Sequence, residues 1–357
     1  MRARSLVVVA FALSPVASVA AQSPVPEIRF DATTDFLKLP PNLYLGEVAG
    51  VAMDARRHLF VYSRTGTRST LHGQSSAQLF EFGPDGQFIR EIGKDLYGFA
   101  FAHTVRIDKD GNIWATDEGT NMIMKFNQAG KVLMVLGRRA EAVEEAPPAP
   151  AGGARAGPPR PVWGQFNRPT DVAWDLAGNI FIADGYNNSR VVKVDKNGRW
   201  VKTWGDRGAD TGQFNILHSI ASDAKGNIYV ADRTNNRIQV FDPDGKFLRM
   251  FKIEVPFNKE PNVMVGAPPG PNTLSVSGAP WAICITPPPN QVLYSADAVP
   301  GRIYKLSLDG KVLGVLGEAG KEIKQFGWIH EISCPSENEL YVAELLNWRV
   351  QKLTLHP

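Results

Sequence analysis

Residues 213–242, QFNILHSIASDAKGNIYVADRTNNRIQVFD, decide the fold of this chain. Their pattern predicts three short strands separated by polar turns, and the turn at 242–245 leads into a fourth strand. Glycine beside an acid or amide is typical of hairpin turns, because glycine adopts a positive φ and the neighbouring side chain caps the turn. The stretch therefore predicts a four-stranded antiparallel meander.

The meander recurs along the chain at a period of roughly 40 to 60 residues, which is typical of a propeller. Six copies are present, and their first strands are expected at 50–54, 103–108, 170–175, 219–222, 281–285 and 330–334. The repeated pattern resembles the NHL type. We therefore predict an all-β fold, a six-bladed β-propeller of NHL-type repeats. A strand at 27–30 is expected to complete the last blade, because this removes an open sheet edge.

The ends and insertions define one domain. Arg2 and Arg4 precede a short apolar run and small residues up to Ala21, which predicts a signal peptide over residues 1–21 and export to the periplasm or outside the cell. Residues 22–357 form the single propeller domain. Residues 140–161 are predicted to be a mobile insertion and residues 254–280 a long loop, since both are rich in proline and small or polar residues.

Composition excludes some partners. The net charge of +3, without a basic block, argues against nucleic acid, and the only apolar run is far too short for a membrane span. We expect a monomer. The cysteines, Cys284 and Cys334, could form a disulfide in an exported protein. They are one position out of phase between repeats, so we favour two buried free thiols on opposite strand faces.

Histidine recurs in phase in alternate repeats. At the start of the six first strands the aligned residues are Ala49, His103, Thr170, His218, Trp281 and His330. First strands line the central channel, so the three imidazoles should converge on its axis. Three histidines with an open fourth position are typical of catalytic Zn²⁺, and nitrogen ligands also suit other transition metals. The remaining histidines, His58, His72 and His356, are out of phase and are interpreted as surface residues.

Polar residues also follow the second strands. The closing acids, among them Asp184 and Asp232, are interpreted as turn caps. Arginine recurs after these turns, which indicates an architectural role for Arg190, Arg237, Arg302 and Arg349. By contrast, Arg64, Tyr186 and Arg233 do not repeat, so they are candidate functional residues.

Two pairs of motifs carry a family resemblance: NRPTDVA (167–173) with ADGYNNSRV (183–191), and GQFNILHS (212–219) with VADRTNNRIQ (230–239). They resemble the peptidyl-α-hydroxyglycine α-amidating lyases (peptidylamidoglycolate lyases) over nearly all of the mature chain. The resemblance implies catalytic Zn²⁺ on His103, His218 and His330. It also implies structural Ca²⁺ on the carbonyls of Val51 and Val105 and the carboxylate of Glu331. The family's catalytic tyrosine and two arginines fall on Tyr186, Arg64 and Arg233.

The chain departs from the family at several positions. Glu331 stands where the family has aspartate, and Trp328 replaces a methionine of the substrate pocket. Asn187 and its neighbours replace the cysteines of animal members.

The resemblance implies a zinc-dependent lyase that splits a peptidyl-α-hydroxyglycine-like hemiaminal into an amide and glyoxylate. The substrate would be a small molecule or a peptide, with Tyr186 as base and Arg64 or Arg233 holding the carboxylate. The alternative is an exported, non-catalytic NHL propeller that binds a protein or glycan and has a structural metal. A propeller lactonase is disfavoured, because such sites use carboxylate and asparagine ligands. No Gly-x-Ser-x-Gly motif supports serine catalysis.

Overall fold

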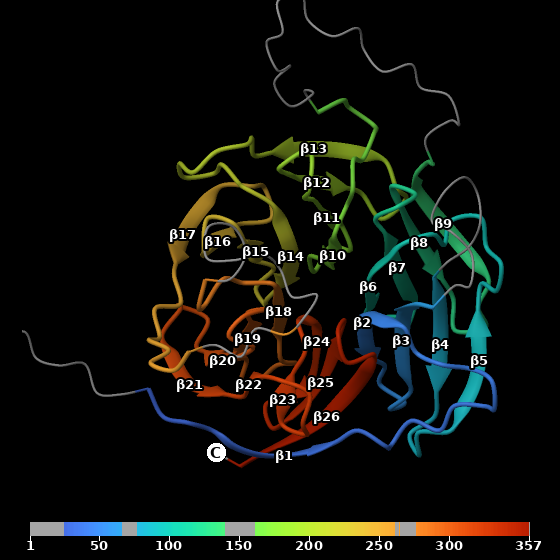
Figure 1. Cartoon of the computed structure of the whole chain (residues 1–357). Coiled ribbons are helices and arrows are strands. Elements are labelled where there is room, and N and C mark those ends of the chain that lie inside the picture. The colour runs from blue at the N-terminus through green and yellow to red at the C-terminus, as the bar shows by residue number, and fades with distance from the viewer. Residues whose placement is uncertain (1–24, 66–76, 140–160, 261–263, 265–275, 357) are drawn as a thin grey trace, which may run out of the picture.

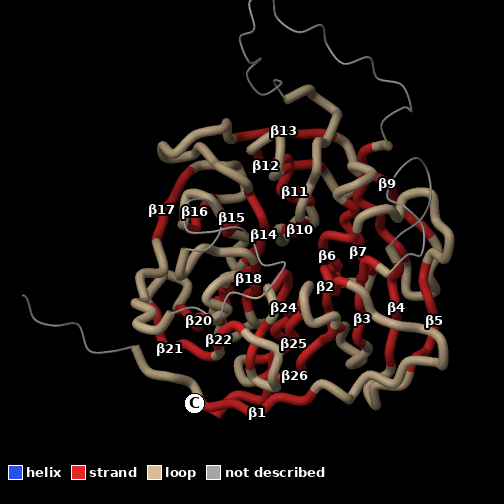
Figure 2. Tube along the Cα trace, viewed as in Figure 1, coloured by secondary structure: helices blue, strands red, loops and turns tan. Residues whose placement is uncertain are grey.

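Six four-stranded antiparallel sheets form a ring around a central axis in the computed structural model (Figure 1). The structure describes residues 25–65, 77–139, 161–260, 264 and 276–356. Within these ranges there are strands, turns and loops but no helix (Figure 2), and therefore no helix that could cross a membrane. The predicted six-bladed β-propeller is confirmed. The signal peptide (1–21) and nearly all of the 140–161 insertion lie outside the described residues, as does much of the 254–280 loop.

The strands follow the predicted repeats, each blade running from the channel outward. Blade one consists of β2 (Glu47–Met53), β3 (Leu59–Arg64), β4 (Gln78–Phe82) and β5 (Phe88–Ile92). Blade two consists of β6 (Ala102–Ile107), β7 (Ile113–Asp117), β8 (Met122–Phe126) and β9 (Val132–Gly137). Blade three consists of β10 (Asp171–Trp174), β11 (Ile180–Asp184), β12 (Arg190–Val194) and β13 (Trp200–Trp204). Blades four and five consist of β14 (Leu217–Ser222), β15 (Ile228–Asp232), β16 (Arg237–Phe241) and β17 (Phe247–Phe251); and β18 (Ala282–Ile285), β19 (Leu293–Ala296), β20 (Ile303–Leu306) and β21 (Val312–Leu316). A short parallel pair follows, β22 (Glu318–Ala319) and β23 (Gln325–Phe326).

The sixth blade closes the ring with both ends of the chain. It consists of β24 (Ile329–Ser336), β25 (Glu339–Glu344) and β26 (Arg349–His356), and β1 (Arg29–Thr33) is its outermost strand. β1 runs antiparallel to β26, with Arg29 opposite His356 (Figure 1). The predicted closing strand is thus confirmed, two residues later than expected. It covers the edge of the last blade, which would otherwise offer unpaired backbone groups.

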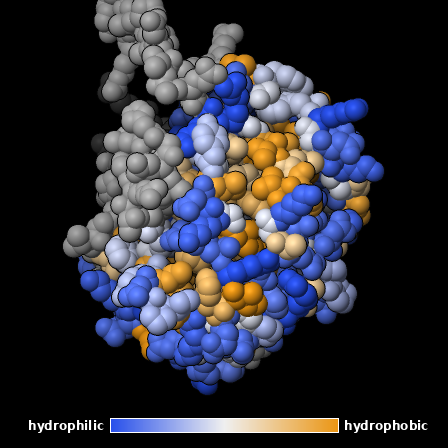
Figure 3. Space-filling view, turned by 90° about the vertical axis from the view of Figure 1, so that its right-hand side faces the viewer, coloured by the Kyte–Doolittle hydropathy of each residue, from blue (hydrophilic) through white to orange (hydrophobic). Residues whose placement is uncertain are grey.

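The hydrophobic core is divided between the blades. Six clusters of buried residues lie around the ring, each between two consecutive blades. The outer strands alternate instead between partly buried and exposed residues, as in β9. On that side of the molecule hydrophobic residues are interspersed among hydrophilic ones (Figure 3). The channel end of each blade is therefore held rigidly by packing on both sides.

The repeated arginines are architectural, as predicted. Arg190 Nε donates to Asp184 at 2.9 Å and Arg237 Nε donates to Asp232 at 2.7 Å. Each arginine also donates to the carbonyls of the preceding loop, such as Gln213. Each pair ties a loop to the end of its second strand.

The prediction of free thiols is wrong, because Cys284 and Cys334 form a disulfide with their Cα atoms 6.1 Å apart. The alternation itself holds, because Cys284 shares a face of β18 with Ala282, and Cys334 shares a face of β24 with Ile332. The inference from it fails because neighbouring blades are stacked face to face. Opposite faces of blades five and six therefore meet in one buried cluster, where the two cysteines lie together. The disulfide joins the inner strands of blades five and six.

Replacing both cysteines by alanine should lower the free energy of unfolding by about 2–4 kcal/mol, because the bond closes a loop between residues 50 positions apart. Urea unfolding of the wild type, the double variant and the reduced wild type measures this difference. Thiol titration of the denatured, unreduced protein should find no free thiol. Two titratable thiols with unchanged stability would contradict the bond.

Candidate metal centre and its surroundings

Each of the three in-phase histidines lies at a β-bulge. In blade four Leu217 pairs with Asp232 and Ser219 pairs with Ala231, so His218 between them has no partner residue. The same shift leaves His103 and His330 unpaired at the start of β6 and β24. A bulge adds one residue to a strand and turns its side chain away from the regular alternation. Here it points three imidazoles at one another.

The three imidazoles form a nearly regular triangle on the channel axis. Their ring centroids are 4.8 Å apart for His103 and His218, 4.6 Å for His103 and His330, and 5.0 Å for His218 and His330. One ligand atom from each residue lies within 4.8 Å of the other two, and all three side chains are buried. The structure therefore brings together the histidines that the sequence placed in phase.

Hydrogen bonds between blades orient the rings. The Nδ1 of His218 is 2.6 Å from the carbonyl of Trp281, and the Nδ1 of His330 is 2.7 Å from the carbonyl of Ala49. A carbonyl only accepts, so Nδ1 carries the hydrogen and Nε2 keeps its lone pair. Trp281 and Ala49 are the residues aligned with the histidines in the next blades. The rings of His218 and His330 are thus oriented by the next blade, as in many metal sites.

The electrostatics of the site favour neutral imidazoles. Burial and, to a smaller extent, the nearby Arg64 lower the pKa of His330 to about 3. Burial also lowers the pKa of His103 and of His218, and Arg233 contributes to both shifts. The Nε2 of His218 and both ring nitrogens of His103 have no hydrogen-bond partner among the described residues. Unprotonated, unpaired nitrogens of this kind are the donors that a transition metal requires.

Tyr186 and Arg233 flank the triangle. The Tyr186 ring lies 5.7 Å from the His103 ring and 5.9 Å from the His218 ring. Nη1 of Arg233 donates to the Tyr186 hydroxyl at 3.5 Å, and the guanidinium stacks on the Trp281 ring at 4.0 Å. Burial raises the pKa of Tyr186 above its ordinary value, while Arg233 acts to lower it. Desolvation thus outweighs the effect of Arg233 on the phenol.

Arg233 is a buried cation without a carboxylate partner. Its exposed fraction is 4%, its Nε has no hydrogen-bond partner, and no ion pair involves it among the described residues. A buried charge without a partner is costly. A free guanidinium at this place is suited to an anionic ligand.

Arg64 lies on the other side of the site and is more constrained. Its Nε donates to the Ala102 carbonyl at 2.9 Å and its Nη1 to Glu47 at 2.8 Å, and the guanidinium stacks on Phe101 at 3.7 Å. Ala102 and Phe101 directly precede His103. The arginine therefore supports the strand start that presents this histidine.

The sequence reasoning missed an ion pair at the site. Glu118 is buried, and its Oε2 is 3.8 Å from Nε2 of His103. Arg168 donates from Nε to Glu118 at 2.6 Å, and its guanidinium lies 4.4 Å from the Tyr186 ring centre. Glu118 follows its second strand as Arg233 follows its own, so the same alignment column contained the signal.

Trp328 contributes to the wall of the site. It has a positive φ of 60°, and its ring meets the Trp281 ring edge-on at 5.2 Å. Trp281 in turn lies 4.7 Å from His218. The tryptophan that replaces the family's methionine is thus linked to the histidines through one aromatic neighbour.

The residues expected to hold calcium have a different arrangement. Oε2 of Glu331 accepts hydrogen bonds from the backbone N–H of Val51 at 2.9 Å and of Val105 at 3.2 Å. Its Oε1 is 3.1 Å from Nε of Arg106. Burial raises the pKa of Glu331 to about 8, against the lowering by Arg106. The carboxylate faces donors and a guanidinium, which does not fit a calcium ion between these three residues.

Comparison with known proteins agrees with the predicted resemblance. The NHL repeat model matches residues 214–241. The chain is 31% identical over 201 residues to peptidyl-glycine alpha-amidating monooxygenase A of Xenopus laevis, covering 50% of the chain and 19% of that protein. It is 27% identical over 354 residues to peptidyl-glycine alpha-amidating monooxygenase of Mus musculus, covering 92% of the chain and 33% of that protein.

A shorter relative carries the lyase name alone. The chain is 28% identical over 172 residues to the probable peptidyl-alpha-hydroxyglycine alpha-amidating lyase pgal-1 of Caenorhabditis elegans, with 44% of each protein covered. The alignments thus span less than half of the length of each of these three relatives.

Solved structures share the fold. A streptogramin B lyase has a TM-score of 0.56 at 13% identity, covering 92% of this chain and 98% of its own. A gluconolactonase from Xanthomonas campestris has a TM-score of 0.57 at 16% identity, covering 96% and 99%. At such identities these likenesses show the propeller only. The chain is thus a propeller with an NHL repeat, and its sequence is similar to the peptidyl-α-hydroxyglycine α-amidating lyases.

Proposed function

We propose that this chain is a zinc-dependent lyase that cleaves a peptidyl-α-hydroxyglycine-like hemiaminal into an amide and glyoxylate. One observation carries the proposal: three neutral, converging histidines lie beside Tyr186 and the unpaired cation of Arg233. The substrate class has a hydroxyl, a departing amide nitrogen and a carboxylate. The site has a group suited to each of them.

The histidines fit zinc as ligands. Their set of three imidazoles, with Nδ1 hydrogens donated to carbonyls at His218 and His330, is typical of catalytic zinc with an open position. A zinc ion bound there would supply a Lewis acid in a site lined by buried side chains.

The chain's own residues divide the remaining work. The reaction breaks the C–N bond, whose electrons go to nitrogen, while the hydroxyl loses its proton as the aldehyde forms. Tyr186, whose phenol is protonated at rest, would relay protons at Oη: it would give its own proton to the departing nitrogen as it receives the proton of the hydroxyl. Arg233 would hold the carboxylate, which a guanidinium matches in shape and charge. Arg64 would add positive potential from the far side of the site.

The purified protein should release glyoxylate from α-hydroxyhippurate, an α-hydroxyglycine amide, because this compound has all three reacting groups. Glyoxylate is measured colorimetrically, together with the zinc content of each chain. Zinc without glyoxylate release would exclude this reaction and favour a non-catalytic propeller that binds a protein or glycan.

His218→Ala should abolish glyoxylate release and weaken zinc binding by more than the roughly 10- to 100-fold loss that follows removal of a ligand's hydrogen-bond partner. Competition with a chromophoric chelator measures the affinity. His58→Ala is the matched control, because His58 is bonded to Glu81 at 2.8 Å and is outside the triangle. A His218→Ala protein with wild-type zinc affinity and activity would refute the assignment of the ligands.

Tyr186→Phe should lower kcat by about 10²- to 10⁴-fold, the usual contribution of a proton-transfer group, while zinc binding stays unchanged. The substitution removes one hydroxyl from a buried ring, so the fold should persist, and circular dichroism checks this. Wild-type kcat in this variant would exclude Tyr186 from proton transfer.

A further inference from the structure

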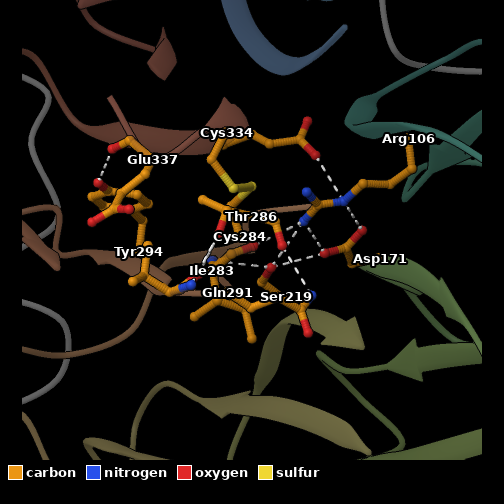
Figure 4. Close-up of a disulfide and its surroundings, with 12 residues drawn as sticks. Arg106, Asp171, Ser219, Ile283, Cys284, Thr286, Gln291, Tyr294, Cys334 and Glu337 are labelled. Carbon is orange, nitrogen blue, oxygen red and sulfur yellow. Dashed lines mark hydrogen bonds and ion pairs between the residues drawn. A yellow bond between two sulfur atoms is a disulfide. The ribbon is translucent and has the colours of Figure 1, made fainter. Parts of the chain in front are cut away.

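A cluster of oxygen atoms surrounds the guanidinium of Arg106 in the channel (Figure 4). Nε and Nη2 donate to the two carboxylate oxygens of Asp171 at 2.9 and 2.6 Å. Nη2 also lies 3.2 Å from the Ser219 hydroxyl and 3.3 Å from the Ile283 carbonyl. Nε is 3.1 Å from Oε1 of Glu331. Carboxylate, hydroxyl and carbonyl oxygens are the donors that hard cations prefer.

This cluster connects the whole ring. Arg106 belongs to blade two, and its partners belong to blades three, four, five and six. Glu331 extends the network to blade one through the N–H of Val51. The Cys284–Cys334 disulfide lies beside the cluster (Figure 4) and joins blades five and six. All six inner strands therefore meet at one buried charge network.

The cluster lies next to the histidines along the same strands. Ser219 directly follows His218, and Glu331 directly follows His330. Arg106 is three residues after His103 in β6. Movement of any of these three strands would change both the cluster and the imidazole triangle.

We propose that Arg106 is the built-in cation of this channel, doing with a guanidinium what the family resemblance assigns to calcium. Its charge pairs with the buried Asp171 carboxylate, its Nε contacts Glu331, and together these contacts fix the inner strands. It is thus a positioning residue for the histidine triangle, a part of the proposal that rests on the proposed zinc site. The wild-type chain accordingly needs no calcium.

Removing this charge leaves the buried Asp171 carboxylate and Glu331 without a cation, among other oxygen ligands. Arg106→Gln should lower the Tm by at least about 5 °C, because breaking a buried ion pair leaves uncompensated charge. Added Ca²⁺ should restore part of the loss, since the remaining oxygens suit it. Arg106→Lys keeps the positive charge but cannot form the paired hydrogen bonds of a guanidinium to Asp171. Its Tm should therefore fall less than that of Arg106→Gln, and added Ca²⁺ should not raise it.

The test measures calcium content and the Tm with EGTA or millimolar Ca²⁺ for the wild type, both variants and Arg56→Gln. Arg56 is the control because it pairs with Asp54 at the surface, with 45% of its side chain exposed. In the wild type we expect no bound calcium and no change in Tm with EGTA or with Ca²⁺. Stoichiometric calcium or a fall in Tm with EGTA there would overturn the proposal, even if Arg106→Gln does not fold. Wild-type stability in Arg106→Gln would also overturn it.

Zinc affinity gives a separate readout. Arg106→Gln should weaken zinc binding by about tenfold through the displaced histidine strands, and Arg106→Lys should restore most of it. Unchanged zinc affinity in a folded Arg106→Gln protein would refute the positioning role. A wild type that binds no zinc would refute the proposed function instead, and the calcium results would still decide whether Arg106 is the channel's cation.

Discussion

The hydrogen bonds from histidine Nδ1 atoms to carbonyls of the next blade connect the fold to the site. They exist only when consecutive blades are packed at the right distance, as for His218 with Trp281 and His330 with Ala49. They also settle which ring nitrogen is free. Closure of the ring by β1 and β26 is therefore a condition for the imidazole triangle as well as for stability.

Local sequence patterns were sufficient for the fold and for the converging histidines. The Asp-x-x-Gly-Asn turn recurs at 108–112, 175–179 and 223–227, and four strands recur in each repeat, so the register of His103, His218 and His330 could be counted. Counting gave the strand faces of Cys284 and Cys334 but missed their bond, because neighbouring blades bring opposite faces together. It also failed to find the Glu118–Arg168 pair, because their contact joins different blades. Contacts between blades depend on packing that no single repeat contains.

The calcium expectation shows a different limit of sequence reasoning. Val51, Val105 and Glu331 stand at the right positions, but position alone does not say whether a backbone presents its carbonyl or its N–H. Nor did the alignment show that Arg106, one residue after Val105, reaches across the channel to Asp171. A single long side chain changed the charge balance of the cluster without altering the repeat pattern.

The Arg106 cluster and the histidine triangle are neighbouring layers of the channel, and they differ in how many of their buried polar atoms have hydrogen-bond partners. Around Arg106 the Asp171 carboxylate accepts two bonds from the guanidinium and the N–H of Ile220 at 3.0 Å, and Oε1 of Glu331 has the ion pair with Arg106 but, among the described residues, no hydrogen bond. In the histidine layer the Nε2 of His218 and the Nε of Arg233 are buried without partners. Unsatisfied buried polar atoms cost free energy, so they tend to persist where a ligand completes them. The Arg106 layer thus supplies the rigidity, and the histidine layer is where the proposed metal and substrate would bind.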